Sequence, residues 1–102
     1  MRVRSFRENV FLKNPKRLKL IQFWSAWCGS CIDTKHLEDF CKFNSRVEVY
    51  RLNVEENQLY AQRYSVVIVP TYIFFRNLKP VLTLIGEQAK KDLEKKLINL
   101  KF

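Results

Sequence analysis

The sequence predicts an α/β domain built on a mixed sheet with helices on both faces. Residues 19–24 and 66–75 are dense in β-branched and aromatic residues, as central strands are. Residues 28–44 and 89–100 instead carry apolar residues at helical spacing. The early alternation of strands and helices favours this architecture. Because 102 residues suit one core and no linker-like stretch occurs, we expect a single domain over residues 1–102.

The N-terminal quarter is expected to supply two strands. Residues 2–6 alternate weakly, as an edge strand does, and residues 8–13 suit a short helical segment. Asn14-Pro15 ends that segment, because the residue before a proline avoids the helical conformation. Residues 19–24 are apolar on both faces, which is typical of a central strand.

Residues 28–44 are predicted to form one continuous helix. Leu37, Phe40 and Cys41 fall at positions i, i+3 and i+4, and Asn44 stands at the end. If this helix begins at Cys28, that thiol lies at the positive end of the helix. Such a position favours the thiolate, which is the reactive form of cysteine.

The remaining elements alternate again and close with a hairpin and a helix. Residues 46–53 alternate as a strand, and residues 55–64 suit a short helix. The strand predicted over residues 66–75 is followed by a turn at 77–80 and a partner strand at 81–85. With the amphipathic helix at the C-terminal end, the expected order is β-α-β-α-β-α-β-β-α.

The net charge of +9 comes from 19 basic and 10 acidic residues, and the basic residues are densest near the two ends of the chain. A basic chain attracts nucleic acids and acidic proteins. However, no aromatic residue is interleaved with the charges to stack on bases. We therefore expect the charge to serve solubility, and we do not expect a nucleic-acid partner.

The compartment is expected to be the cytoplasm. No stretch approaches about 20 apolar residues, so we expect no membrane span. The first seven residues lack the apolar core of a signal peptide. Three unevenly placed cysteines are too few for a disulfide framework.

The tetrapeptide Cys28-Gly29-Ser30-Cys31 carries the clearest chemical signal. Two cysteines three positions apart can share one disulfide or hold two thiols close together. They follow the apolar strand at 19–24 and stand directly after Trp27. A C-x-x-C behind a strand in an intracellular chain is typical of a thiol–disulfide redox site.

The motif residues 23–31, Phe-Trp-Ser-Ala-Trp-Cys-Gly-Ser-Cys, together with Val69-Pro70-Thr71 at the right separation, resemble the thioredoxin family. The likeness runs over nearly the whole chain. It implies the thioredoxin fold, a central mixed five-stranded sheet flanked by four helices. It also implies a protein-disulfide reductase that acts in cell redox homeostasis without a cofactor or metal. We expect a monomer, because no apolar stripe is left over once the core is assigned.

The resemblance implies a division of labour between the cysteines. Cys28 attacks a disulfide of a client protein, and Cys31, buried one turn deeper, then attacks Cys28 and releases the reduced client. A thioredoxin-reductase-like electron donor restores the dithiol. A cis peptide bond at Pro70 turns the backbone of Val69 outward to pair with an extended client segment.

Further site residues follow from the same resemblance. The residues expected to bind the client are Trp27, Gly29, Ser30, Val69, Pro70 and Gly86. Gln22 and Arg51 are expected to support catalysis.

Four positions depart from the family pattern. Gln22 replaces a buried aspartate and cannot take a proton, so Cys31 is expected to be activated more slowly. Ser30 replaces a proline between the cysteines. His36 replaces a helix-kinking proline and is expected to be a solvated residue of a straighter helix. Leu78 replaces a hairpin glycine, so a different turn type is expected.

Three alternatives remain open on the sequence. One is a thiol–disulfide oxidase or isomerase, which differs from a reductase in redox potential. Another is a non-catalytic, basic interaction module that docks a partner through Trp27 and Pro70. The third is a zinc knuckle of Cys28, Cys31, His36 and Cys41. In a helix, however, each five-residue step rotates the side chain by about 140°, so the last three would point apart.

Overall fold

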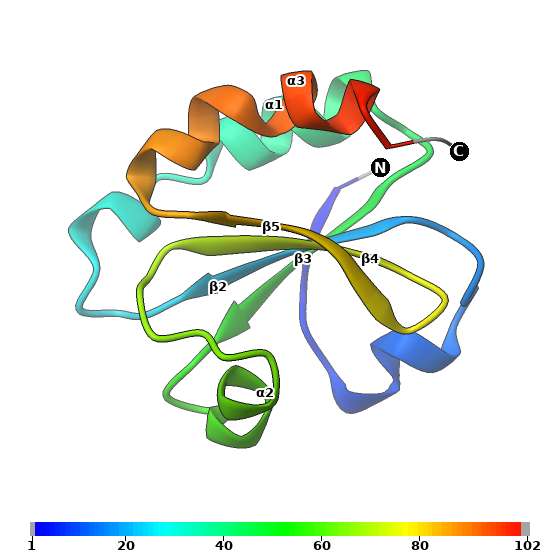
Figure 1. The fold of residues 1–102 in the computed structure, drawn as a ribbon. Helices are drawn as coiled ribbons and strands as arrows, with labels where there is room; N and C mark the ends of the chain where they lie inside the picture. The colour runs from blue at the N-terminus through cyan, green and yellow to red at the C-terminus, as the bar shows by residue number, and fades with distance from the viewer. Residues whose placement is uncertain (1, 101–102) are drawn as a thin grey trace.

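Five strands form a central sheet in the order β1-β3-β2-β4-β5 in the computed structural model, which describes residues 2–100 (Figure 1). The strands are β1 (Val3–Ser5), β2 (Lys19–Trp24), β3 (Glu48–Asn53), β4 (Thr71–Arg76) and β5 (Lys79–Ile85). β1, β3 and β2 run parallel, whereas β4 is antiparallel to β2 and to β5. The predicted mixed sheet of five strands is therefore confirmed.

Helices cover both faces of this sheet. The helices α1 (Lys35–Phe43) and α3 (Leu93–Ile98) lie on one face, and α2 (Gln58–Arg63) lies on the other (Figure 1). Three further segments are 3-10 helices: η1 (Glu8–Leu12), η2 (Gly29–Cys31) and η3 (Glu87–Asp92). Of the four helices expected, three are α-helical within the described part of the chain, and the segment at 8–13 is a 3-10 helix instead.

The strands β2 and β4 separate two apolar cores, because successive side chains point to opposite faces of a sheet. Leu20 of β2 and Phe74 of β4 pack with Leu37 of α1 in the core beneath α1 and α3. Ile21 and Phe75 pack in the core on the opposite face. This alternation confirms the prediction that 19–24 is a central strand buried on both sides.

The strand predicted over residues 66–75 begins later than expected, at Thr71. Pro70 has no N–H to contribute to a ladder of hydrogen bonds, so pairing starts after it. The peptide bond between Val69 and Pro70 is cis, as the resemblance implied. The residues before it run as a loop along the end of the sheet.

The hairpin between β4 and β5 turns on two residues with positive φ, Asn77 at 52° and Leu78 at 70°. Two such residues are what a type I′ turn requires, and its twist matches that of the strands it joins. β5 consequently starts at Lys79 rather than at residue 81. Pro80 is tolerated within β5 because this strand is at the edge of the sheet.

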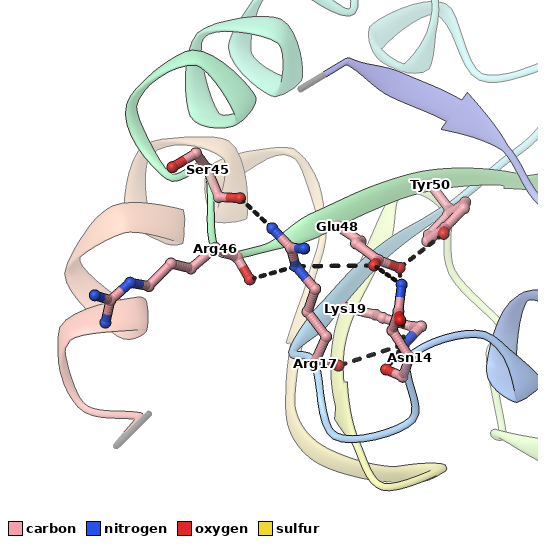
Figure 2. A network of polar contacts seen from close by, with 7 residues as sticks. All are labelled: Asn14, Arg17, Lys19, Ser45, Arg46, Glu48 and Tyr50. Carbon is pink, nitrogen blue, oxygen red and sulfur yellow. Dashed lines mark hydrogen bonds and ion pairs between the residues drawn. The ribbon is translucent and has the colours of Figure 1, made fainter.

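A buried ion pair lies at the start of β2 and β3, at the end of the sheet away from the cysteines (Figure 2). Nζ of Lys19 is 3.7 Å from Oε1 of Glu48, and both side chains are 3% exposed. Glu48 also accepts hydrogen bonds from Tyr50 at 2.9 Å and from Asn14 at 3.2 Å. The buried charges are thus paired and hydrogen-bonded, as buried charges must be.

Candidate active site

The two motif cysteines form a disulfide with their Cα atoms 5.3 Å apart. Cys31 is 0% exposed and lies against the sheet, whereas Cys28 is partly exposed. One sulfur-bearing residue is thus accessible from outside, and its partner is enclosed by protein.

The helix predicted from Cys28 does not begin there. η2 spans three residues only, and α1 starts at Lys35. Between them, the side chain of Asp33 accepts a hydrogen bond from the N–H of Lys35 at 2.9 Å, and Thr34 is the N-cap residue of α1. The expectation that a long helix presents its positive end to Cys28 is therefore wrong.

Three loops meet at the end of the sheet where the disulfide lies. Phe23 pairs with Thr71, and Thr71 pairs with Ile85. The loop after β2, the loop before β4 and Gly86 after β5 therefore lie at the same end of the sheet (Figure 1). This arrangement brings the motif, Val69-Pro70 and Gly86 to one side of the molecule, although they are up to 58 positions apart in sequence (86 − 28).

Apolar side chains are exposed on these loops. Trp27 is 87% exposed beside Cys28, and Ile32 just after Cys31 is 67% exposed. Val67 is 91% exposed and Ile68 is 53% exposed in the loop before β4. Exposed apolar side chains that gather at one end of the sheet suit a surface that contacts another molecule.

Gly86 adopts a conformation that favours glycine, with φ at 92° and ψ at 172°. Its N–H donates a hydrogen bond to the carbonyl oxygen of Pro70 at 2.8 Å, which fixes the two loops together. A Cβ atom at this position would meet no atom of residues 2–100 within 4 Å. The space in front of Gly86 is therefore open.

A row of four hydrogen-bonded side chains lies behind the motif; we call Arg51, Gln22, Tyr72 and His36 the polar row. Nε of Arg51 is 2.7 Å from Oε1 of Gln22. Nε2 of Gln22 is 3.2 Å from the hydroxyl of Tyr72, which is 2.8 Å from Nε2 of His36. Gln22 and Tyr72 are both 0% exposed.

The polar row contacts the motif directly through Arg51. Nη2 of Arg51 donates a hydrogen bond to the carbonyl oxygen of Cys31 at 2.6 Å. Lys90 similarly donates to the carbonyl oxygen of Ser30 at 2.7 Å. Two cations thus hold the backbone of the motif.

His36 was expected to be solvated, but it is half-buried and bonded to Tyr72. Burial, with the charges of Lys90 and Arg51, lowers the pKa of His36 to about 4, against the opposing effect of Asp33. Burial raises the pKa of Tyr72 to about 12. The sequence analysis gave neither residue a role in the site. The pairing of Gln22 with Tyr72 in adjacent strands would have indicated that two polar side chains meet in the core.

The zinc alternative is contradicted within residues 2–100, where no group of three metal-ligating side chains is gathered. Cys28 and Cys31 are bonded to each other, and Cys41 is buried in the core beneath α1, as predicted for a small apolar residue. In the same part of the chain, no helix has both the length and the apolar character needed to cross a membrane.

Comparison with known proteins identifies the family. A family model described as Thioredoxin matches residues 2–99. A thioredoxin from Alicyclobacillus acidocaldarius is 39% identical over 83 residues, 79% of each chain, and one from Buchnera aphidicola is 36% identical over 92 residues, 88% of this chain and 83% of its own. The structure of Fasciola hepatica thioredoxin matches with a TM-score of 0.84 and 28% identity, covering 99% of this chain and 100% of that one. The chain therefore belongs to the thioredoxin family of thiol–disulfide oxidoreductases, and Cys28 and Cys31 are its redox-active pair.

Proposed function

We propose that this protein works in the cytoplasm as a monomeric, single-domain protein-disulfide reductase. The observation that carries the proposal is the difference in exposure between the two cysteines. Cys28 is partly exposed among apolar loop residues, and Cys31 is 0% exposed behind it. A nucleophile that meets clients and a resolving thiol that only meets the first thiol need this asymmetry.

The reaction runs in two exchanges. The thiolate of Cys28 attacks a client disulfide, so that a bond from Cys28 to the client forms and the second client sulfur leaves as a thiolate. Cys31 then attacks Cys28, the bond to the client breaks, and the client leaves with both sulfurs reduced. Two electrons pass from the dithiol to the client, and the protons of the two thiols end on the client sulfurs.

The client would dock on the loops that meet around the disulfide. Trp27, with Gly29 and Ser30 of the motif, would contact one side of it, and the Val69-Pro70 peptide the other. Neither backbone polar group of Val69 has a backbone partner within residues 2–100, so both are available to an extended client segment. The open space in front of Gly86 would admit the client backbone.

Gln22 and Arg51 would support the chemistry from behind. Their bond orients the guanidinium that holds the carbonyl of Cys31. The cysteine pair is itself the redox group, so the proposed reaction needs no cofactor or metal. A thioredoxin-reductase-like protein would return the electrons.

An oxidase is the second candidate, and one observation favours it. Arg51 and Lys90 both place positive charge at carbonyl groups of the motif. Positive charge stabilises thiolates and hence the reduced dithiol, which makes the disulfide more oxidising. The midpoint potential separates the two candidates: a value near that of thioredoxins favours the reductase, and a value near that of strong oxidants overturns it.

Insulin reduction with dithiothreitol as the electron source tests the proposal. We expect turnover by the natural chain, none by Cys28→Ser, and unchanged turnover by the control Cys41→Ser. The Cys31→Ser variant should stop after the first exchange and stay covalently joined to insulin. A folded natural chain that does not reduce insulin would overturn the assignment as a general reductase.

A further inference from the structure

We propose that Tyr72 and His36 are positioning residues, which lock Arg51 against the backbone carbonyl of Cys31 and so keep a positive charge close to the resolving cysteine. The inference rests on the proposed two-step exchange and adds two residues to it. It accounts for how Cys31 is activated although residue 22 is an amide that accepts no proton.

The direction of every hydrogen bond in the polar row follows from its first member. A guanidinium can only donate, so Oε1 of Gln22 accepts from Arg51. The amide group of Gln22 is left to donate to the oxygen of Tyr72. The hydroxyl proton of Tyr72 is then free to go to Nε2 of His36, 2.8 Å away.

This order requires His36 to be neutral, with its proton on Nδ1. If Nε2 also carried a proton, His36 and Gln22 would both donate to Tyr72, and the hydroxyl proton would lose its acceptor. Nδ1 of His36 is buried without a close hydrogen-bond partner among the described residues, although a backbone group of Asp33 lies near enough to favour the protonated ring. The charged groups around the ring are Lys90, Arg51 and Asp33, and the two cations together with burial favour the neutral form.

The far end of the polar row acts on Cys31. Nη2 of Arg51 is 2.6 Å from the carbonyl oxygen of Cys31, and its Cζ is 4.2 Å from the ring centre of Trp24. No ion pair joins Arg51 to a carboxylate within residues 2–100. A guanidinium held at the backbone of Cys31 without a counter-charge would favour the thiolate of that residue, whereas burial of Cys31 alone would disfavour it.

The step affected is the second exchange. Cys31 must lose its proton before its sulfur attacks Cys28, and the departing sulfur takes up a proton when it leaves as a thiol. A fixed guanidinium raises the fraction of Cys31 that is thiolate without itself accepting the proton. The first exchange, by Cys28, does not depend on the polar row in this way.

The test separates the two exchanges with a small disulfide, so that it needs no protein client. Reduced protein and dithiobis(nitrobenzoate) form a mixed disulfide on Cys28 and release one coloured thiol; Cys31 then releases the second. We expect Tyr72→Phe to slow the second release about tenfold and to raise the Cys31 thiol pKa, measured in a Cys28→Ser background, by about one unit. The first release should be unchanged. Tyr60→Phe, at a tyrosine with no hydroxyl bond among the described contacts, is the matched control.

A pair of substitutions at His36 distinguishes positioning from mere packing. His36→Gln keeps an acceptor for the hydroxyl of Tyr72 and should retain most of the rate of the second thiol release. His36→Leu has no acceptor and should slow the second release as Tyr72→Phe does. Unchanged second release and thiol pKa in folded Tyr72→Phe and His36→Leu would overturn the inference. Because the probe is a small molecule, failure to reduce insulin would leave this outcome unaffected and would count against the proposed function instead.

Discussion

The indole N–H of Trp27 donates a hydrogen bond to Oε2 of Glu55 at 2.9 Å, although Trp27 is 87% exposed. The other carboxylate oxygen of Glu55 accepts from the hydroxyl of Ser25 at 2.8 Å and from the N–H of Ala26 at 3.2 Å. The bond from Ser25 is the main cause that holds the pKa of Glu55 below its ordinary value; burial opposes it, and the bonds from Ala26 and Trp27 add to the lowering. One carboxylate therefore fixes the orientation of the most exposed aromatic ring beside Cys28.

Replacing Glu55 with alanine is expected to loosen Trp27. The ring would lose its only hydrogen bond among the described residues, so client binding should weaken while the chemistry at Cys28 stays intact. In a Trp24→Phe background, Trp27 fluorescence anisotropy should decay faster, and KM for insulin should rise about threefold, equivalent to ~0.7 kcal/mol. Reaction with a small disulfide should be unchanged.

The neighbouring carboxylate provides a control, since Glu56 is exposed and makes no bond to Trp27. Glu56→Ala should leave both the anisotropy and KM as they are. An unaltered anisotropy in Glu55→Ala would show that the hydrogen bond does not hold the ring.

Much of this fold could be predicted from the sequence, because the periodicity and type of the side chains indicate which of them are buried. The run at 19–24 is apolar on both sides because two cores meet β2, and the pairing of Cys28 with Cys31 follows from their spacing. The break between η2 and α1, where Asp33 accepts a hydrogen bond from the N–H of Lys35, was not predicted. A hydrophobic pattern cannot distinguish a continuous helix from two segments that share a face.

Only two members of the polar row, Gln22 and Arg51, were predicted as site residues, for a different reason. Gln22 stands out as an amide in an apolar strand, but its partners come from elements distant in sequence. Tyr72 looks like an ordinary strand aromatic, and His36 looks like a polar helix residue. Only the strand register and the packing of α1 on the sheet bring the two rings within 5.7 Å.

The ion pair of Lys19 and Glu48 yields a stability prediction. Removing either partner leaves a charge in a place where water does not reach, which costs about 3–5 kcal/mol for a fully buried pair. We expect Lys19→Met to cost less than Glu48→Leu, because Glu48 keeps Arg17 at 3.8 Å and two hydrogen bonds. Among the described residues, Lys19 without Glu48 keeps only the carbonyl oxygens of Asn14 and Arg17.

Urea unfolding of the two single variants and of the double variant Lys19→Met/Glu48→Leu measures the coupling. The double variant should be more stable than the sum of the single losses predicts, by about 1–3 kcal/mol. Thiol–disulfide exchange should not change in any folded variant, because the pair lies at the other end of β2. Strictly additive losses would mean that the two charges do not interact.

The hairpin offers a stabilising substitution. Leu78 adopts a φ of 70°, a region that costs a residue with a Cβ roughly 1 kcal/mol, and its side chain is 49% exposed. Leu78→Gly should therefore raise the free energy of unfolding by about 0.5–1 kcal/mol, net of the greater entropy of glycine in the unfolded chain. Thermal unfolding of the natural chain and both variants measures the effect. Leu78→Ala, which removes the rest of the side chain but keeps the Cβ, should give no such gain. Equal effects of the two substitutions would assign the change to the leucine side chain instead.

His36 should make the stability of the protein depend on pH between its two pKa values. Its pKa falls from 6.5 to about 4 on folding, chiefly because burial disfavours the charged ring. The unfolded chain therefore binds a proton more readily, so the contribution of neutral His36 is complete above pH 6.5 and is lost as the pH falls toward 4. Relative to His36→Gln, the natural chain should lose about 2 kcal/mol of unfolding free energy between neutral pH and pH 4, a figure already reduced for solvent screening.

Urea unfolding of both chains at steps of half a pH unit gives the difference in unfolding free energy as a function of pH, in which the carboxylates common to both chains cancel. A flat difference curve would show that His36 titrates alike in the folded and unfolded chains, and that its ring is not held neutral by its position beneath the motif.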